Sequence, residues 1–427
     1  MQQVQLEDKM KPKLAYHWII AAACMLIAII GLGLANGTLS LYVKPICDDL
    51  GFSRKAYSLV YTIAYVFQMT ACLTFGAVQK RFGGVKKIFL IGASSLIAAF
   101  IIYSQAKSIS LFYIGAAFFG IGIGYTAAVP LSVMIANWFI EKRGTILSTV
   151  YSGSGIGGII LNPVVGNWIA TAGWRASYLF SILLILVFLI PAYILLKENP
   201  SVMGLVPFGA NSQASLNHDL QKALSGTTLE QVWKTPLFRR IAGAILLFGI
   251  SIQPVYVNAA AHLGEAGLNS QIVAIIMGGV FLSNTLSKIL LGMINDKYGI
   301  KPVLMINNLF FGIGTLFLIF TSKAAFGFAF AAFFGVSYTM TSITIPMLTS
   351  TLYPGRDYGK ILGILVAIQT AGYALGTPLN GLCFDLFHSY SYSFGLAILL
   401  DFIAVTLVLT ALGDRNILAS NNRLRDQ

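Results

Sequence analysis

The sequence contains few charged residues. Only 10% of its 427 positions are Asp, Glu, Lys or Arg, whereas soluble globular domains carry about 25%. Hydrophobic residues make up 57% of the chain. This composition excludes an ordinary water-soluble domain and predicts a polytopic membrane protein.

Cysteine is also scarce. Of the four cysteines Cys24, Cys47, Cys72 and Cys383, three lie within or at the end of apolar runs. None has the spacing of metal ligands or of a disulfide framework, so we expect no metal site and no cofactor. The pattern G-x-G-x-x-G in YSGSGIGGIILNP (151–163) lies in an apolar run with no strand before it. Close helix packing explains these glycines better than dinucleotide binding does.

Catalytic sequence motifs are missing as well. The chain has no phosphate-binding loop, no His-Glu-x-x-His pair and no serine-centred nucleophile elbow. We therefore predict that the protein is neither an enzyme nor an ATP-driven pump.

Long apolar runs dominate what is present. Each run is near or above the roughly 20 residues that a membrane-spanning helix needs. The sequence therefore predicts an all-α membrane protein with twelve transmembrane helices. The predicted spans are 15–43, 56–78, 87–106, 110–138, 145–171, 176–196, 240–262, 270–294, 302–322, 325–350, 361–384 and 391–412.

The basic residues are distributed unevenly over the segments between the spans. If both termini are cytoplasmic, 21 of the 28 Lys and Arg lie on the cytoplasmic side. Six lie on the outer side, and Lys288 lies inside a span. This bias predicts a multi-pass protein of the cell membrane with both termini in the cytoplasm. We expect the basic residues to face anionic membrane lipids and not nucleic acid.

The two halves of the chain repeat each other at a nearly constant offset. Pro130 and Pro346 are 216 positions apart, and Pro163 and Pro378 are 215 apart. Each half holds six spans, so the halves are parallel repeats that can rock about a site near the bilayer midplane. The predicted domains are an N-terminal half (1–196), a cytoplasmic linker (197–239) and a C-terminal half (240–427). Within the linker, LEQVWKTP (229–236) predicts a short amphipathic helix on the membrane face.

Lys288 is a cation in the middle of the eighth span. Its repeat equivalent is Cys72, so the charge is not a requirement of the repeated fold. One interpretation is structural: the side chain snorkels toward an interface, or pairs with Asp401 of the last span. The other is that Lys288 lines a central cavity and binds a negatively charged substrate.

Other polar residues lie at depths that suit a central cavity. Tyrosines inside membrane helices also serve as packing or interface residues, which stays open as an alternative. Asn258 and His262 share one helix face, and His262 is expected near the outer mouth, either as a gate residue or as a satisfied loop histidine. The cavity candidates are Tyr61, Tyr65, Tyr125, Ser152, Ser154, Asn258, Asn284, Tyr338 and Gln369.

Two loop sequences resemble the signature of the major facilitator superfamily, Gly-x-x-x-Asp-Arg/Lys-x-Gly. GMINDKYGIK (292–301) carries it intact, and GAVQKRFGGVKK (76–87) carries a copy in which Lys80 replaces the acid. GWR (173–175) fits the start of the superfamily's sixth helix. The resemblance implies the twelve-helix fold and a cytoplasmic gate at these loops. The implied gate residues are Gly76, Arg81, Arg143, Gly292, Asp296 and Lys297.

Within that superfamily the chain resembles the monocarboxylate transporter and oxalate:formate antiporter group. The resemblance rests on SLYVKPICDDLGFSR (40–54), NWFIEKRG (137–144), TLEQVWKTPLF (228–238), SKILLGMINDKYG (287–299) and GTPLNGLCFDLFHSYSYSF (376–394).

This resemblance places Lys288 where the group has a substrate-binding Arg, and Lys44 where it has an outer Lys. Asn284 replaces the acid of proton-linked members, so exchange or facilitated diffusion is favoured over proton symport. Residues 368–370 hold no second central cation, which suits a monoanion.

Together these features predict a transporter of a small organic anion, with a monocarboxylate as the expected substrate, that works by alternating access. We expect a monomer in contact with membrane lipids. Two alternatives remain open: an exporter of hydrophobic compounds on the same fold, and a transport-inactive sensor.

Overall fold

The computed structural model describes residues 16–141, 143–209, 229–353 and 357–413. The N-terminal half begins with a span over Tyr16–Leu50, which includes the π-helical segment η1 (Ile29–Asn36) and α2 (Leu39–Leu50). It continues with α3 (Arg54–Phe82), α4 (Val85–Gln105), α5 (Ile109–Thr126), α6 (Ala128–Trp138) and α7 (Arg143–Leu195). The linker region contributes η2 (Pro200–Met203) and α9 (Leu229–Trp233). The C-terminal half holds α10 (Pro236–Glu265), α11 (Ser270–Tyr298), α12 (Ile300–Ile319), α13 (Ala324–Ser337), η3 (Tyr338–Thr341), α14 (Thr344–Leu352), α15 (Tyr358–Phe387) and α16 (Ser391–Gly413).

The predicted all-helical membrane fold is confirmed. Within the described residues, 11 helices are long and apolar enough to cross a membrane. One of them, Thr145–Leu195, has 51 residues, more than twice the length of a spanning helix. Gly173 interrupts it with a backbone φ of 84° and ψ of 162°, a left-handed conformation that only glycine adopts readily. The chain therefore turns at Gly173, and α7 supplies both the fifth and the sixth of twelve spans.

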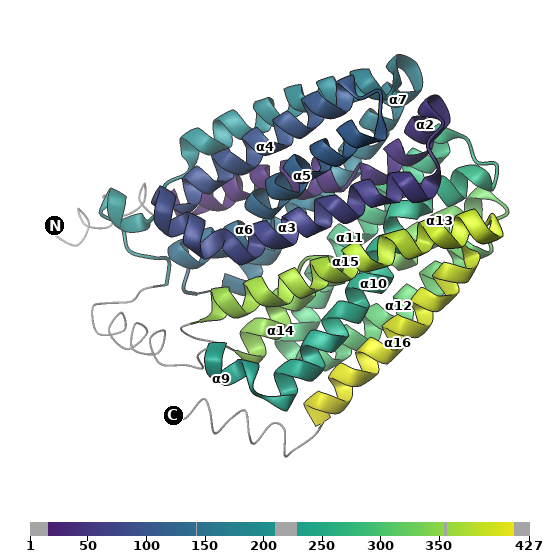
Figure 1. Cartoon of the computed structure of the whole chain (residues 1–427). Helices are drawn as coiled ribbons and strands as arrows, with labels where there is room; N and C mark the ends of the chain where they lie inside the picture. Colours follow the sequence, from purple (N-terminus) through teal and green to yellow (C-terminus); the bar gives the residue numbers. More distant parts are fainter. Residues whose placement is uncertain (1–15, 142, 210–228, 354–356, 414–427) are drawn as a thin grey trace.

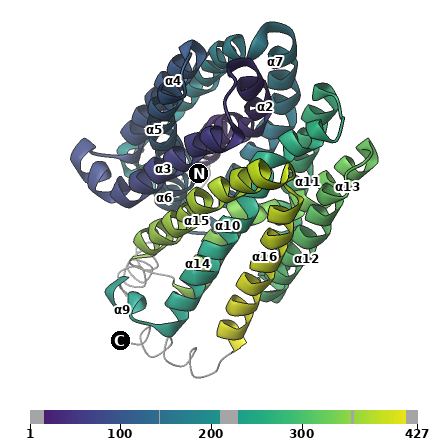
Figure 2. The same cartoon turned by 45° about the vertical axis from the view of Figure 1, so that its right-hand side comes forward.

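The two halves lie side by side, with their main contacts between α3 and α15 and between α7 and α11. Figure 1 shows the N-terminal half, purple to teal, above α10 to α16, green to yellow. Figure 2 shows α3 alongside α15 from a second direction. Glycine permits the close approach of α7 to α11, because a Cβ atom on Gly155 would lie 1.6 Å from Thr285 Oγ1. This packing accounts for the small residues in 151–163.

The fourth and tenth spans are both broken at equivalent positions. The first break separates α5 from α6 at Ala127, whose φ of −101° and ψ of −130° are not helical. The second separates α13 from α14 through η3. Pro130 and Pro346 follow these breaks, and proline has no N–H to donate to the carbonyl four residues earlier. Irregular backbone at this depth is tolerated only where protein or an aqueous cavity surrounds it.

The described parts of the linker, before residue 210 and from residue 229, pack against one half each. Glu198 accepts hydrogen bonds from the backbone N–H groups of Val85 (2.6 Å) and Lys86 (3.0 Å), which caps the start of α4. Phe208 pairs with Phe139 in an isolated β-bridge. On the other side, α9 buries Val232 and donates the Leu229 N–H to an Asp357 carboxylate oxygen at 2.9 Å. A helix therefore forms within the predicted LEQVWKTP segment, but it covers five residues and is packed against the C-terminal half.

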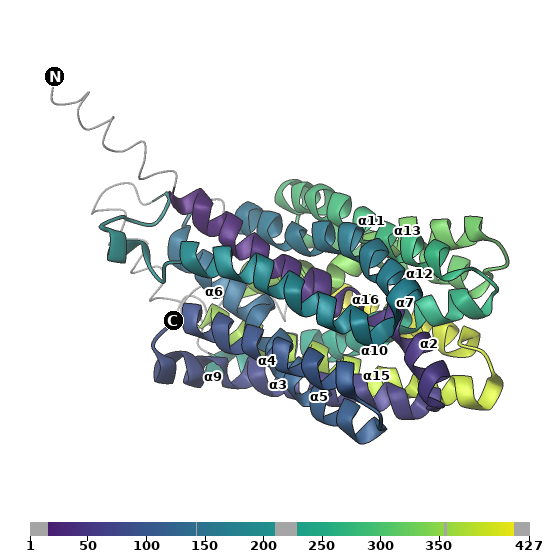
Figure 3. The same cartoon turned by 90° about the horizontal axis from the view of Figure 1, so that it is seen from above.

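These linker segments lie at one end of the bundle, which we call the linker face; the other end is the opposite face. Figure 3 shows the helices running between the two ends, with α9 near one end and α2 near the other. The helices α3 and α11 run toward the linker face, and α10, α15 and the first span of α7 (143–172) run away from it. Depth along the bundle can therefore be followed from residue numbers on these helices.

Candidate functional site

A central cavity of about 50 Å³ lies between the two halves. A water molecule needs at least about 10–15 Å³ of such space, so the cavity has room for a few waters or one small molecule. Polar side chains and the broken segments of both halves contribute to its wall. The lining residues are Leu32, Asn36, Gln68, Ile123, Ala127, Ala128, Ser154, Gln253, Phe281, Asn284, Lys288, Tyr338, Thr341, Ser342, Val366, Gln369, Thr370 and Tyr373.

Lys288 is the cation of this cavity, and it is only 1% exposed. Its Nζ donates to the Tyr151 carbonyl oxygen at 3.0 Å and to Ser154 Oγ at 2.8 Å. Both acceptors lie on α7, so the lysine of one half is hydrogen-bonded to the other half. The side chain does not snorkel toward the linker face. An ammonium has three donors, and these two bonds use two of them.

The acidic partner considered from the sequence is elsewhere. Asp401 is fully buried in α16 and accepts a hydrogen bond from Asn308 Nδ2 of α12 at 2.7 Å. None of the ion pairs found within the described ranges includes Lys288. The acceptors that hold Lys288 are therefore neutral oxygen atoms.

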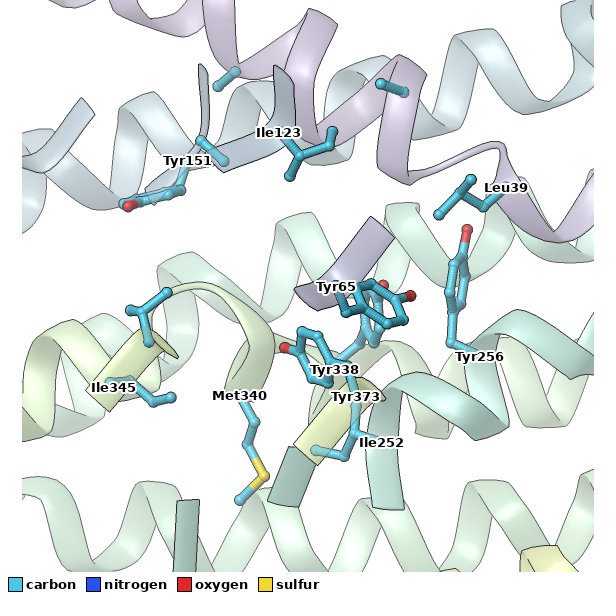
Figure 4. Packing of buried hydrophobic residues seen from close by; sticks show 14 of the residues in the cluster. Leu39, Tyr65, Ile123, Tyr151, Ile252, Tyr256, Tyr338, Met340, Ile345 and Tyr373 are labelled. Atoms are coloured by element: carbon cyan, nitrogen blue, oxygen red, sulfur yellow. The ribbon is translucent and has the colours of Figure 1, made fainter. Parts of the chain in front are cut away.

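A layer of aromatic and amide side chains covers the cavity on the side of the opposite face. Gln253 Nε2 donates to the Tyr65 hydroxyl at 3.0 Å, and the Tyr338 hydroxyl donates to Gln253 Oε1 at 3.0 Å. The rings of Tyr65 and Tyr373 lie 5.3 Å apart, and those of Tyr256 and Tyr338 lie 4.7 Å apart. Figure 4 shows these tyrosines gathered between the ribbons of the two halves. Tyr65 comes from α3 and Gln253 from α10, so this layer joins the halves.

Further contacts close the bundle at the opposite face. Tyr256 donates to the Gly37 carbonyl oxygen, and Thr62 Oγ1 donates to the Ala374 carbonyl oxygen at 3.3 Å. At the rim, the Arg54 guanidinium lies 3.8 Å from the Glu265 carboxylate. Each of these contacts joins an N-terminal element to a C-terminal one. The central cavity is thus separated from the opposite face by several layers of contact.

The residues predicted for the outer gate take different positions. Lys44 pairs with Asp48 one turn along α2, and Asp48 also lies 3.5 Å from Arg54. Lys44 therefore belongs to the charged cluster at this rim. His262 instead hydrogen-bonds the Leu318 carbonyl oxygen and packs on the ring of Phe394, both in the C-terminal half. We leave His262 out of the gate, because its contacts stay within one half.

The other predicted cavity residues divide into two groups. Lys288, Tyr338, Gln369, Ser154 and Asn284 line the central cavity. The others are held elsewhere and are not in its wall. Tyr61 donates to the Leu39 carbonyl oxygen, Tyr125 lies 3.2 Å from Thr74 Oγ1, Asn258 donates to the Pro254 carbonyl oxygen, Ser152 donates to the Thr149 carbonyl oxygen, and Tyr65 bonds Gln253 above the cavity.

Some lining residues were not predicted from the sequence, most notably Gln68 and Gln253. Each is an amide within an apolar span, a signal that was available. The repeat adds a second signal, because Gln68 and Asn284 are 284 − 68 = 216 positions apart and line the same cavity. Ser154 and Gln369 are 369 − 154 = 215 apart and also form such a pair. The repeat therefore relates two pairs of polar lining residues, whereas the counterpart of Lys288 in the other half is Cys72.

At the linker face the halves are separated by a cavity of about 510 Å³. Gly76 lines this cavity, and Arg81 is exposed at the end of α3. Gly292 faces Met347, and Lys297 lies over the Tyr298 ring at 5.1 Å. The side chains of the remaining predicted gate residues, Arg143 and Asp296, lie outside the described part of the structure. The halves are thus separated at the linker face, whereas at the opposite face they are joined by the contacts described above and leave a pocket of about 240 Å³ beside Lys44. We call the linker face open and the opposite face closed.

Comparison with known proteins gives consistent matches over most of the chain. The model of the Major Facilitator Superfamily matches residues 22–265 and 241–427. The chain is 22% identical over 412 residues to monocarboxylate transporter 12 of Rattus norvegicus, spanning 90% of this chain and 82% of that protein. It is 23% identical over 378 residues to the oxalate:formate antiporter of Oxalobacter formigenes, spanning 85% of this chain and 84% of that protein.

A solved structure agrees with these matches at the level of the fold. The proton:xylose symporter XylE superposes with a TM-score of 0.70, covering 93% of this chain and 96% of that chain. The sequence identity is 18%, so this likeness concerns the fold alone.

Proposed function

Since the chain belongs to the Major Facilitator Superfamily and is therefore a transporter and not an enzyme, we propose that its cargo is a small organic anion bound by Lys288. The relatives that share most of its length are named for monocarboxylates, oxalate and formate. Those names support the proposal, and the chemistry of the central cavity supports it independently.

The environment of Lys288 is the observation that carries the proposal. A buried ammonium without a counter-charge costs several kcal/mol relative to water, on the order of the penalty for a charge at the bilayer centre. Here two neutral oxygens satisfy part of the ammonium, at 3.0 and 2.8 Å, and the rest of its charge faces the cavity. A carboxylate there would supply the missing negative charge through a charge-assisted hydrogen bond.

The neighbouring groups suit one carboxylate with a short polar arm. The cavity wall presents the Gln369 and Asn284 amides and the Tyr338 hydroxyl. Among the described lining residues Lys288 is the one cation, so a monoanion is matched in charge and a dianion is not. The volume of about 50 Å³ further favours a compact substrate of a few non-hydrogen atoms.

We propose that transport follows the rocking of two bodies, residues 1–196 and 240–427, joined by the linker 197–239. The present state opens to the linker face. The excess of Lys and Arg in the segments at this face supports a cytoplasmic location for it and for both termini, in the cell membrane. The cavity is complete within one chain, which supports a functional monomer.

Exchange or facilitated diffusion fits the site better than proton symport. Asn284 lies one turn from Lys288 on α11 and donates from Nδ2 to the Gly335 carbonyl oxygen at 3.2 Å. An amide side chain cannot take up or release a proton at physiological pH. We therefore infer that Asn284 orients the site and does not couple it to protons.

The test is uptake and counterflow in proteoliposomes with formate, acetate, lactate and oxalate, comparing the wild type with Lys288→Gln. We expect saturable flux of a carboxylate that falls at least tenfold in Lys288→Gln, because the charge-assisted bond of about 1.5–3 kcal/mol is lost. Lys301→Gln, which removes an exposed lysine at the linker face, is the matched control and should keep the flux. Flux of a neutral compound that survives Lys288→Gln would instead favour an exporter.

A further inference from the structure

The cavity at the linker face, which we call the vestibule, has a wall built by both halves. The helices α3 and α6 line one side, and α15 and the start of α9 line the other. Its apolar wall residues include Phe75, Val129 and Ile364. Two cations also belong to the lining, Lys80 of α3 and Lys360 of α15.

The vestibule continues the central cavity along the same helix faces. On α3, Gln68 lines the cavity and Cys72, one turn further, lines the vestibule. On α15, Val366 lines the cavity and Gly363, three residues earlier, lines the vestibule. Residues three or four apart share one face of a helix. The vestibule and the central cavity therefore lie along the same faces of α3 and α15.

The two lysines give this passage a positive rim. Lys80 is exposed, and it has no ion-pair partner in the described part of the chain. The side chain of Lys360 is 69% exposed and lies 2.9 Å from Asp357, which also accepts the Leu229 N–H. Among the described residues that line the vestibule there is no acid, and Asp357, the ion-pair partner of Lys360, also bonds the α9 backbone.

The repeat shows that this charge is specific to the N-terminal half. Lys80 and Asp296 are 296 − 80 = 216 positions apart, so one copy of the loop has a cation where the other has an acid. The substitution changes the charge at that place by two units. It adds positive charge to the half of the mouth that faces Lys360 across the vestibule.

We propose that the vestibule is a second anion site, in which Lys80 and Lys360 hold a small carboxylate before it moves to Lys288. This proposal rests on the function proposed above for the central cavity. Clefts with low-dielectric walls and charges of one sign concentrate counter-ions and raise their association rates by about tenfold or more. The two lysines come from opposite halves. A carboxylate bound between them would therefore reduce the repulsion between the two ammonium groups when the halves approach each other.

The native Cys72 lines the vestibule and is 6% exposed, so we expect its slow modification to serve as a reporter that needs no knowledge of the substrate. The other three cysteines are replaced (Cys24→Ala, Cys47→Ala and Cys383→Ser), and the protein is placed in nanodiscs of neutral lipid. The rate of Cys72 modification is then compared for an anionic and a cationic methanethiosulfonate reagent. We expect the anionic reagent to react about tenfold faster at low ionic strength, with the preference shrinking in salt.

Substitutions of the two lysines test whether they cause the faster reaction of Cys72 with the anionic reagent. Lys80→Gln and Lys360→Gln should each lower the ratio of rates about threefold, and the double variant should bring it near one. Lys80→Arg should keep the ratio, which separates charge from folding. Lys87→Gln removes an exposed lysine at the same face that does not line the vestibule, and it should have no effect. If the ratio of the two modification rates is the same in the wild type and in the double variant, the proposal is overturned.

Occupancy is tested by protection of Cys72. Sodium lactate should slow the anionic reagent more than sodium chloride at equal ionic strength, and the double variant should lose this difference. Equal slowing by both salts would show screening without a site and would overturn the proposal. Lys288→Gln keeps the preference at Cys72 if the vestibule is a separate site. Absence of carboxylate flux together with a lysine-dependent preference would reject the proposed transport function and leave the anion site standing.

Discussion

At the scale of single residues, the main feature of the site is a lysine that only one of the two repeated halves carries. The pairs Gln68 and Asn284, and Ser154 and Gln369, repeat at offsets of 216 and 215, whereas Lys288 corresponds to Cys72. The oxygens that hold Lys288, on Tyr151 and Ser154, have counterparts 215 positions later at Val366 and Gln369. We therefore expect a lysine at position 72 to find oxygen acceptors near the Val366 carbonyl and the Gln369 amide, although these groups also bond Thr370 and Met340.

This correspondence predicts that Cys72→Lys changes the preferred charge of the substrate. With a cation from each half, the site should favour oxalate over lactate by about tenfold more than the wild type does, because one added charge-assisted bond contributes about 1.5–3 kcal/mol. Competition of unlabelled oxalate against labelled lactate uptake measures the shift. Cys72→Met is the neutral control. An unchanged ratio of inhibition constants would show that position 72 does not reach the anion.

Residue by residue, the sequence allowed part of the site to be foreseen. Lys288 stood out because a cation in an apolar span has few structural explanations. Tyr61 and Asn258 did not reach the cavity, because a polar side chain within a helix can satisfy itself on a nearby carbonyl oxygen. Their direction depends on helix rotation, which spacing alone does not fix. Gln253 was missed, although a buried amide in a membrane span needs partners as much as a tyrosine does.

At the scale of helices, closure at the opposite face depends on pairs between elements of different halves. The Arg54 side chain is 11% exposed and the Glu265 side chain 29%, so their interaction is only partly screened by water. Exposed ion pairs contribute about 0–1 kcal/mol, and partial burial places this pair toward the upper end. That amount is enough to shift the balance between two conformations severalfold.

We predict that Glu265→Gln loosens this closure and makes the buried Cys47 of α2 accessible. Maleimide labelling of Cys47 should rise about threefold, and Arg54→Gln should have a similar effect. Asp49→Asn is the control, because Asp49 pairs with Arg175 at 2.9 Å within the N-terminal half. Equal labelling in Glu265→Gln and Asp49→Asn would rule out a gate formed by Arg54 and Glu265.

The helices themselves were largely predictable because their lengths are set by the thickness of the bilayer. The apolar runs gave the twelve spans, and the repeat gave the parallel halves. Two features were not foreseen. One is the broken tenth span at η3, which is followed by Pro346, a residue with no N–H to donate to the carbonyl four residues earlier. The other is the docking of linker residues 196–208, which depends on individual bonds such as those of Glu198.

At the scale of the whole molecule, the structure has one closed face and one open face around a small polar centre. Both ends of the linker are attached, one at α4 and the other at α15. A rocking motion must therefore carry Glu198 with the N-terminal half and α9 with the C-terminal half. The bonds of Lys288 to α7 must change in the same motion, since they also join the halves.

If Lys288 binds a monoanion as proposed, its unpaired charge should also determine how the carrier responds to voltage. An empty carrier has one net positive charge at its centre, and a carrier loaded with a monoanion has none. One-for-one exchange of monoanions should therefore generate no current, whereas net release should generate one. Current recorded on solid-supported membranes during pure exchange would contradict this.

If the Lys288 charge of the empty carrier crosses the full transmembrane potential, the return of the empty carrier is biased by about 2.3 kcal/mol per 100 mV. The membrane potential would then set the direction of net anion flow without any proton gradient.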